Sequence, residues 1–160
     1  MKELCALLGP IFNIAFIGFL LILSINLTLV SQAQSATKKN LIPDSGDKIY
    51  KFSLSGDQEV PADNSQASGH CTALLRKNQI TFEIICNHDI KNPTVAHIHK
   101  SHPGTDRSII IMPFEAAESP IEQTFTLAQN ITNELLLGNL YINIHSREFP
   151  NGEIRGQIKN

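Results

Sequence analysis

Residues 71–86 have the sequence CTALLRKNQITFEIIC, and their pattern of apolar positions predicts a β-hairpin. On each arm, every second residue is apolar or a cysteine, which is typical of a strand with one buried face. Closing the hairpin at Asn78-Gln79 brings the two sets to the same side of the sheet. The register that results pairs Leu75 with Phe82, Ala73 with Ile84 and Cys71 with Cys86.

The two cysteines of this hairpin are predicted to form a disulfide. The chain has three cysteines, and Cys5 lies in an N-terminal segment that we expect to be removed. An even number in an exported domain favours a bridge, and one register here aligns both the sulfur pair and the apolar face. A metal pair or a reactive thiol is the alternative for Cys71 and Cys86, although neither lies in a recognisable ligand cluster.

The N-terminus has the pattern of an export signal. From Leu4 to Val30 there is no acidic, basic or histidine residue, and Ser31-Gln32-Ala33 then places small residues where signal peptidase requires them. We predict a signal peptide at residues 1–33, cleavage after Ala33 and a secreted or periplasmic product. The alternative is a membrane anchor that stays uncleaved, because the apolar run is longer than the usual stretch of about 7–15 residues.

Downstream of the signal, residues 34–47 are polar and predict a flexible leader, and residues 48–160 predict a single domain. Short runs of β-branched and aromatic residues alternate with turn signals, as in a sandwich or barrel. The predicted strands are Ile49–Leu54, Gly69–Leu75, Ile80–Asn87, Thr94–His99, Ser108–Phe114, Ile121–Leu127, Leu140–His145 and Glu153–Ile158.

One helical turn is predicted between the last strands. Asn130 can cap a segment from Ile131 to Leu137, and Gly138 can end it. The predicted fold class is therefore all-β, an antiparallel Greek-key-like β-sandwich or barrel of about eight strands with one short helical turn.

The charge of the chain bears on which classes of partner it binds. The formal net charge is −2, and no basic stripe is visible, which argues against nucleic acid as a partner. No segment beyond the signal is apolar and long enough to span a bilayer, so no membrane contact is expected after cleavage.

Four motifs between about Phe52 and Ile158 resemble the bacterial CHRD (chordin-type) domain, in that family's order. They are Leu54–Pro61 (LSGDQEVP), Ala96–His99 (AHIH), Gly138–His145 (GNLYINIH) and Phe149–Ile158 (FPNGEIRGQI). The resemblance implies an extracytoplasmic, β-sandwich-like module. It implies no activity, because function within the family is poorly defined.

Three histidines on two predicted strands are the candidate metal ligands. In Thr94–His99 the alternate apolar residues face the core, which turns His97 and His99 to the opposite face. The same alternation in Leu140–His145 turns His145 away from the core. If the two strands are neighbours, the three imidazoles converge and can hold copper or zinc.

The register of the last hairpin follows from its turn. A three-residue loop at Pro150-Asn151-Gly152, with Gly152 at positive φ, pairs Ile144 with Ile158 and His145 with Gln157. This register puts the polar residues of the last strand on the face of the histidines.

A polar network on this face is the alternative to a metal. The imidazoles would bond to neighbours on a solvated face, and an ion pair between Glu153 and Arg155 would add little stability. The predicted network is Tyr141, Asn143, Glu153, Arg155 and Gln157. The remaining histidines, which we expect to be solvated, are His70, His88 and His102.

Two hypotheses of function follow, and no nucleophile–base set is recognisable that would add an enzymatic one. The first is a non-catalytic extracytoplasmic binding module for an unknown protein or cell-surface polymer. The second is a histidine-based copper or zinc protein, redox-active in the case of copper. An exposed apolar patch near residues 61–64 or at Pro103-Gly104 would favour the first, and convergent imidazoles would favour the second.

Overall fold

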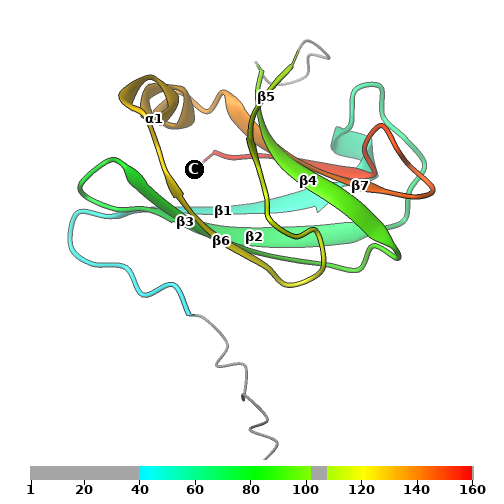
Figure 1. Cartoon of the computed structure of the whole chain (residues 1–160), viewed down its shortest axis with the longest axis horizontal. Helices are drawn as coiled ribbons and strands as arrows, with labels where there is room; N and C mark the ends of the chain where they lie inside the picture. The colour runs from blue at the N-terminus through cyan, green and yellow to red at the C-terminus, as the bar shows by residue number, and fades with distance from the viewer. Residues whose placement is uncertain (1–39, 102–107, 160) are drawn as a thin grey trace, which may run out of the picture. The chain divides into compact units, whose positions relative to one another are not determined.

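Eight antiparallel strands form one curled sheet in the computed structural model, which describes residues 40–101 and 108–159 (Figure 1). The strand order is β5-β4-β7-β8-β1-β2-β3-β6. The strands are β1 (Lys48–Ser55), β2 (Ser68–Leu75), β3 (Thr81–His88), β4 (Pro93–Lys100), β5 (Ile109–Pro113), β6 (Ile121–Thr126), β7 (Leu140–Ser146) and β8 (Ile154–Gln157). A 3-10 turn, η1 (Gly56–Gln58), follows β1, and the helix α1 (Gln129–Leu136) precedes β7. The all-β prediction is confirmed, and the sheet is a half-barrel.

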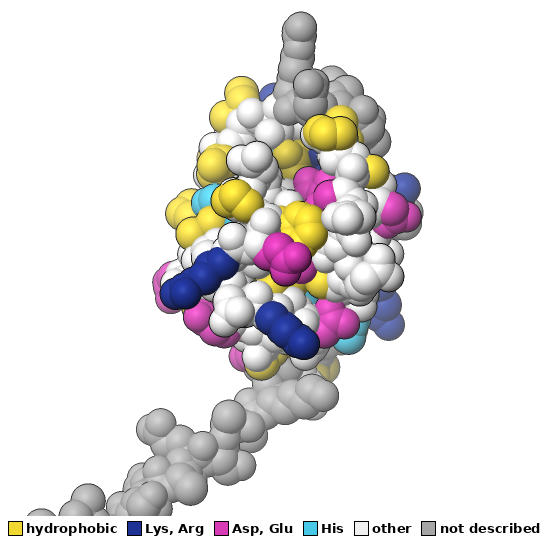
Figure 2. Space-filling view, turned by 90° about the vertical axis from the view of Figure 1, so that its right-hand side faces the viewer, with side chains coloured by type: hydrophobic (Ala, Val, Ile, Leu, Met, Phe, Trp, Pro, Cys, Tyr) yellow, Lys and Arg dark blue, Asp and Glu magenta, His cyan; other side chains and the backbone are white. Residues whose placement is uncertain are grey.

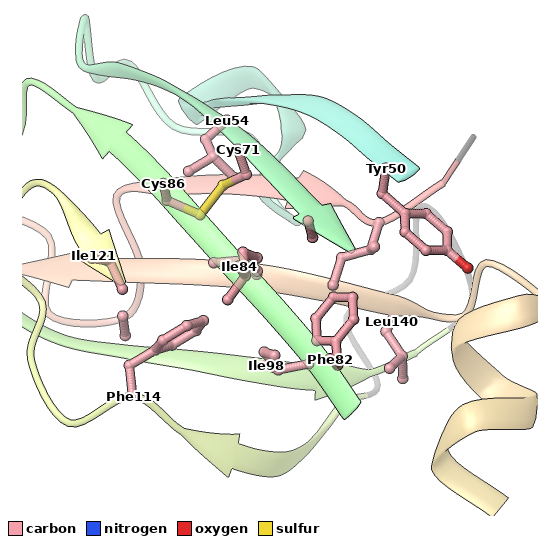
Figure 3. Close-up of a cluster of buried hydrophobic side chains, with 14 of the residues drawn as sticks. Tyr50, Leu54, Cys71, Phe82, Ile84, Cys86, Ile98, Phe114, Ile121 and Leu140 are labelled. Atoms are coloured by element: carbon pink, nitrogen blue, oxygen red, sulfur yellow. A yellow bond between two sulfur atoms is a disulfide. The ribbon is translucent and has the colours of Figure 1, made fainter. Parts of the chain in front are cut away.

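The core lies inside the curl, between the two halves of the sheet. Ile84 of β3, Ile98 of β4 and Ile142 of β7 have no exposed surface, so both halves contribute to one apolar cluster (Figure 3). Phe82, which the first hairpin places on the same side, packs edge-on against Tyr50 of β1. Strand alternation alone therefore assigns the inward residues of these strands correctly.

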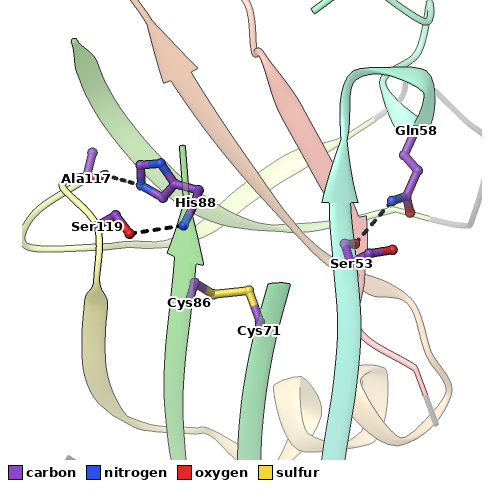
Figure 4. The surroundings of a disulfide bond; sticks show 7 residues. All are labelled: Ser53, Gln58, Cys71, Cys86, His88, Ala117 and Ser119. Carbon is purple, nitrogen blue, oxygen red and sulfur yellow. Dashed lines mark hydrogen bonds between the residues drawn. A yellow bond between two sulfur atoms is a disulfide. The ribbon is translucent and has the colours of Figure 1, made fainter. Parts of the chain in front are cut away.

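The predicted hairpin of β2 and β3 is confirmed residue by residue. Cys71 lies opposite Cys86, and the two apolar pairs beside them are those expected from the pattern. The cysteines form a buried disulfide across the two strands, with their Cα atoms 4.1 Å apart (Figure 4). This bridge links β2 to β3 within the half of the sheet formed by β1, β2, β3 and β6, whose strands pair without a register shift.

The two halves of the sheet meet where β8 crosses β1. The only recorded β1–β8 pair in the described chain is Ser55 with Arg155. Next to it, Gly156 has no room for a side chain, because a Cβ there would collide with the backbone oxygen of Ser53 and with Leu54. Glycine is therefore required for the close approach that joins the halves.

The helix begins earlier than predicted. Ala128, not Asn130, is the N-cap residue, and no side chain caps the helix. The backbone N–H of Leu127 donates to the carbonyl of Ile80, which anchors the chain immediately before the first turn. The prediction that Gly138 ends the helix is confirmed, since this residue adopts a φ of 74°.

The register of the last hairpin differs from the prediction. Ile144 pairs with Ile154 instead of Ile158, and Gln157 pairs with Tyr141 instead of His145. The connection between the strands is longer than three residues, although Gly152 has the predicted positive φ. The slip is an even number of residues, so every side chain keeps its predicted face.

His88 is not solvated, contrary to expectation. Its Nε2 atom donates to the carbonyl of Ala117 at 2.8 Å, and its backbone N–H donates to Ser119 Oγ at 3.0 Å (Figure 4). It ties the end of β3 to the connection before β6. His70 is exposed, as predicted.

Several predictions fall outside the described residues. They are the signal peptide at residues 1–33, residues 34–39 of the leader, His102 and the Pro103-Gly104 turn. Within residues 40–101 and 108–159, no helix is long and apolar enough to cross a membrane. On the face drawn in Figure 2, acidic and basic side chains are interspersed.

Candidate metal centre

The three candidate histidines lie on adjacent strands, on the face of the sheet turned away from the core. β4 pairs with β7, which places His97 opposite Asn143 and His99 opposite Tyr141. His145 lies two residues after Asn143 on β7, opposite Val95. The adjacency on which the prediction depended is therefore present.

The imidazole nitrogens are close enough to share one ion. One ligand atom from each histidine lies within 4.8 Å of the others. The ring centroid of His97 is 5.6 Å from that of His99 and 5.3 Å from that of His145. Nitrogens that bind one tetrahedral ion at about 2.0–2.1 Å are about 3.3 Å apart, so the more distant ligand atoms would have to move closer for all three to bind one ion.

Backbone geometry selects the tautomer of His145. Its Nδ1 atom is 2.9 Å from the carbonyl oxygen of Pro150. A carbonyl only accepts, so Nδ1 carries the proton and Nε2 presents its lone pair. A hydrogen bond of this kind orients many metal-binding imidazoles.

The nitrogens that face the cluster are buried and lack hydrogen bonds. Among the described residues, His97 Nδ1, His145 Nε2 and both ring nitrogens of His99 have no partner. Native proteins satisfy most buried polar atoms, so four such nitrogens in one place need an explanation. A shared cation would satisfy three of them at once.

Burial favours the neutral form of His97 and His99. It lowers the pKa of His99 to about 4, with smaller contributions from His97, His145 and Arg155. The pKa of His97 is also lowered, chiefly by burial and then by His145. Neutral imidazole is the form that binds metal, so burial favours the required protonation state of His97 and His99.

An aromatic and a cationic side chain flank His99. The ring of Tyr141 stacks on His99 with centroids 4.8 Å apart and an interplanar angle of 8°. The guanidinium of Arg155, from β8 on the other side of β7, lies 3.6 Å from the centroid of Tyr141. These contacts fix the position of the His99 ring from the side opposite β5.

Glu59 is a member of the site that the pattern did not indicate. Its Oε1 atom accepts a hydrogen bond of 2.6 Å from Asn143 Nδ2. Burial raises the pKa of Glu59 to about 7; Arg155 opposes this rise and Asp63 adds to it. The loop after β1, which contains Glu59, lies beside the β7–β8 connection (Figure 1).

The five residues of the predicted polar network, Tyr141, Asn143, Glu153, Arg155 and Gln157, are buried and not on a solvated face. Arg155 is 4% exposed and Gln157 is 8% exposed. Gln157 Nε2 donates to the carbonyls of Gly138 and Leu140. Glu153, predicted to pair with Arg155, accepts a hydrogen bond from Ser65 Oγ at 2.9 Å. The loop after β1 covers this face, which a strand pattern cannot show.

Glu59, Ser65 and the Pro150 carbonyl were missed because they lie on loops. The only signal for Glu59 was its place in the motif Leu54–Pro61. Nothing in the local pattern relates it to Asn143, which is far along the chain.

Comparison with known proteins gives the family. Residues 50–158 match the family model for the CHRD domain. Searches of curated proteins and of solved structures each found no match. The match covers more than half of the chain and includes every strand except the first two residues of β1. The chain belongs to the CHRD domain family.

Proposed function

We propose that this domain binds one copper or zinc ion through His97, His99 and His145. The observation that carries the proposal is the convergence of three imidazoles whose ligand atoms lie within 4.8 Å of one another. Burial, the absence of hydrogen bonds among the described residues and the tautomer of His145 support the same assignment.

The donor set favours these two metals. Neutral imidazoles suit zinc and copper, whereas calcium and magnesium prefer oxygen ligands. Three protein ligands leave a fourth position open, as in zinc sites that bind water or substrate. With copper, the same ligands would give a redox-active centre.

Recognition of a protein or surface polymer has less support. The large exposed apolar side chains among the described residues do not include any from residues 61–64, where a patch would have favoured that function. They lie instead on the leader, strand edges and helix end: Ile42, Ile49, Ile80, Val95, Ile109, Ile110, Leu136 and Leu137.

Thermal unfolding with added metal tests the proposal, on chain purified without a histidine tag. An ion at 100 times its dissociation constant stabilises the folded state by about 2.7 kcal/mol, a rise in Tm of about 10 °C for a domain of this size. Alanine at His97, His99 or His145 should abolish most of the rise. His70→Ala is the matched control, because this exposed histidine lies outside the cluster.

Two results would contradict the metal site. One is a wild-type Tm that neither copper nor zinc changes. The other is an equal rise in all four variants, which would place the ion elsewhere.

We further propose that the chain is exported and cleaved after Ala33. The uncharged run from Leu4 to Val30, the small residues before the cleavage point and the buried disulfide support this. Intact mass of the product should correspond to a chain that begins at Gln34. A membrane-bound product that retains Met1 would exclude cleavage.

A further inference from the structure

The side chain of Asn143 ends in a buried oxygen without a partner beside the three histidines. Asn143 is directly opposite His97 on the neighbouring strand, and strand alternation puts both on one face. The residue is only 4% exposed, and Oδ1 has no hydrogen-bond partner among the described residues. A buried acceptor without a donor is costly, so its position calls for a ligand with an N–H or O–H group.

Two neighbours fix the orientation of the amide. Asn143 Nδ2 donates to Glu59 Oε1 at 2.6 Å, which directs the amide oxygen away from that carboxylate. Gly152 lies against the same amide, and a Cβ at residue 152 would collide with Nδ2 and come within 3.1 Å of Oδ1. The amide is therefore held with its nitrogen assigned to Glu59 and its oxygen available.

We propose that Asn143 selects the ligand in the open coordination position, by accepting a hydrogen bond from a metal-bound water, alcohol or amine. This inference rests on the metal site proposed above and specifies what its fourth position accepts. A carbonyl oxygen stabilises a ligand that carries a proton and opposes a bare anion such as azide, which has no hydrogen to donate. Asn143 positions the ligand and does not itself bind the metal.

A pocket adjoins the residues that orient this amide, although neither Asn143 nor the three histidines line it. This pocket of about 370 Å³ is lined by Glu59, Pro150 and Gly152, among others. Glu59 and Gly152 contact the Asn143 amide, and Pro150 holds His145. The groups that orient the amide and one metal ligand are thus also walls of a pocket.

Azide binding to the Co²⁺-loaded chain tests whether Asn143 selects the ligand in the open coordination position. Azide titration is followed by the visible absorption of cobalt in wild type, Asn143→Leu, Glu59→Gln and Glu59→Leu. Loss of the opposing oxygen in Asn143→Leu should lower the azide dissociation constant about tenfold. Glu59→Leu removes the acceptor that holds the Asn143 amide and should also lower the azide dissociation constant. Glu59→Gln keeps an acceptor for Nδ2 and should stay within about twofold of wild type.

Co²⁺ stoichiometry and affinity, measured on the same samples, separate the two proposals. If wild type takes up no Co²⁺, copper or zinc, the metal site fails and the role of Asn143 fails with it. If metal binds but azide affinity is the same in wild type, Asn143→Leu and Glu59→Leu, the metal site stands and the selection is refuted. If Asn143→Leu does not fold, the comparison of Glu59→Leu with Glu59→Gln decides, and equal azide affinity in these two refutes the selection.

Discussion

In metal-free protein, Glu59→Gln should make the fold sensitive to acid, whereas the wild type should change little. His99, which is buried, and Glu59, which is half-buried, titrate in opposite directions over the same pH range. Burial lowers the pKa of His99 from 6.5 to about 4 and raises the pKa of Glu59 from 4.5 to about 7. Glutamine keeps the acceptor for Asn143 but removes one of the two titrations.

The signs follow from which state binds the proton. His99 is protonated more readily in the unfolded chain, so its contribution to stability is present above pH 6.5 and is lost as the pH falls toward 4. Glu59 is protonated more readily in the folded chain, so its contribution is present below pH 4.5 and is lost as the pH rises toward 7. The two slopes therefore cancel in the wild type.

The magnitude comes from the size of the pKa changes. One pKa unit corresponds to about 1.4 kcal/mol, so the full change at His99 amounts to about 3 kcal/mol, of which about 2 kcal/mol is lost by about pH 5. Glu59 offsets this with about 2 kcal/mol of opposite sign. The lowered pKa of His97 acts in the same direction as that of His99.

Urea unfolding with a chelator present, at about pH 7.5 and about pH 5, measures the difference. A loss of about 2 kcal/mol in Glu59→Gln moves the urea midpoint by about 1 M for a small domain. His99→Gln provides the mirror control, because it removes the titration of His99 and keeps that of Glu59, and it should lose less stability in acid than Glu59→Gln. Parallel pH profiles for wild type and Glu59→Gln would show that Glu59 is not a buried titrating group.

Three further predictions concern the stability of the fold. Gln157→Ala should cost about 1–3 kcal/mol, because the carbonyl of Gly138 loses its side-chain donor and that of Leu140 keeps only the backbone N–H of Ile158; a cost below about 0.5 kcal/mol in urea unfolding would mean that this face is solvated. Gly156→Ala should lower the Tm, because its methyl group would meet the backbone oxygen of Ser53, and an unchanged Tm would contradict the close approach of β8 to β1. Replacing both Cys71 and Cys86 by alanine should cost about 3 kcal/mol in urea, whereas equal stability of this variant and the oxidised wild type would mean that the bridge adds nothing.

The face of the sheet on which each side chain lies could be predicted from the sequence, because alternation along a strand is a local property. The register of β2 with β3 was predictable because a short turn and a cysteine pair fix it together. The register of β7 with β8 was not, because pairing Ile144 with Ile154 or with Ile158 buries the same apolar faces. Only the length of the connection distinguishes them, and the turn signal at Gly152 does not set that length.

The convergence of the three candidate histidines was predictable from the sequence, but their environment was not. Two histidines on one strand and one on another share a face whatever the register, so their convergence required only that the strands be neighbours. Burial of that face depends on the loop after β1, whose Glu59 bonds to Asn143. Such contacts between distant segments leave no periodic signal, and the face was therefore expected to be solvated.

A buried polar face on the outside of a curled sheet is costly for a domain of this size. An apolar core lies inside the curl, yet Arg155, Asn143 and His99 are also withdrawn from water. Desolvated groups of this kind weaken a fold unless each finds a partner, and they concentrate where function requires them. A bound divalent ion would give the unpartnered imidazole nitrogens a ligand bond and prevent their protonation in the folded chain. Saturating zinc should therefore raise the stability of Glu59→Gln but leave its loss of stability in acid at least as large, because the metal-bound histidines take up protons only in the unfolded chain. Urea unfolding of this variant with and without zinc, at both pH values, measures this, and a smaller loss in the presence of zinc would contradict the reasoning.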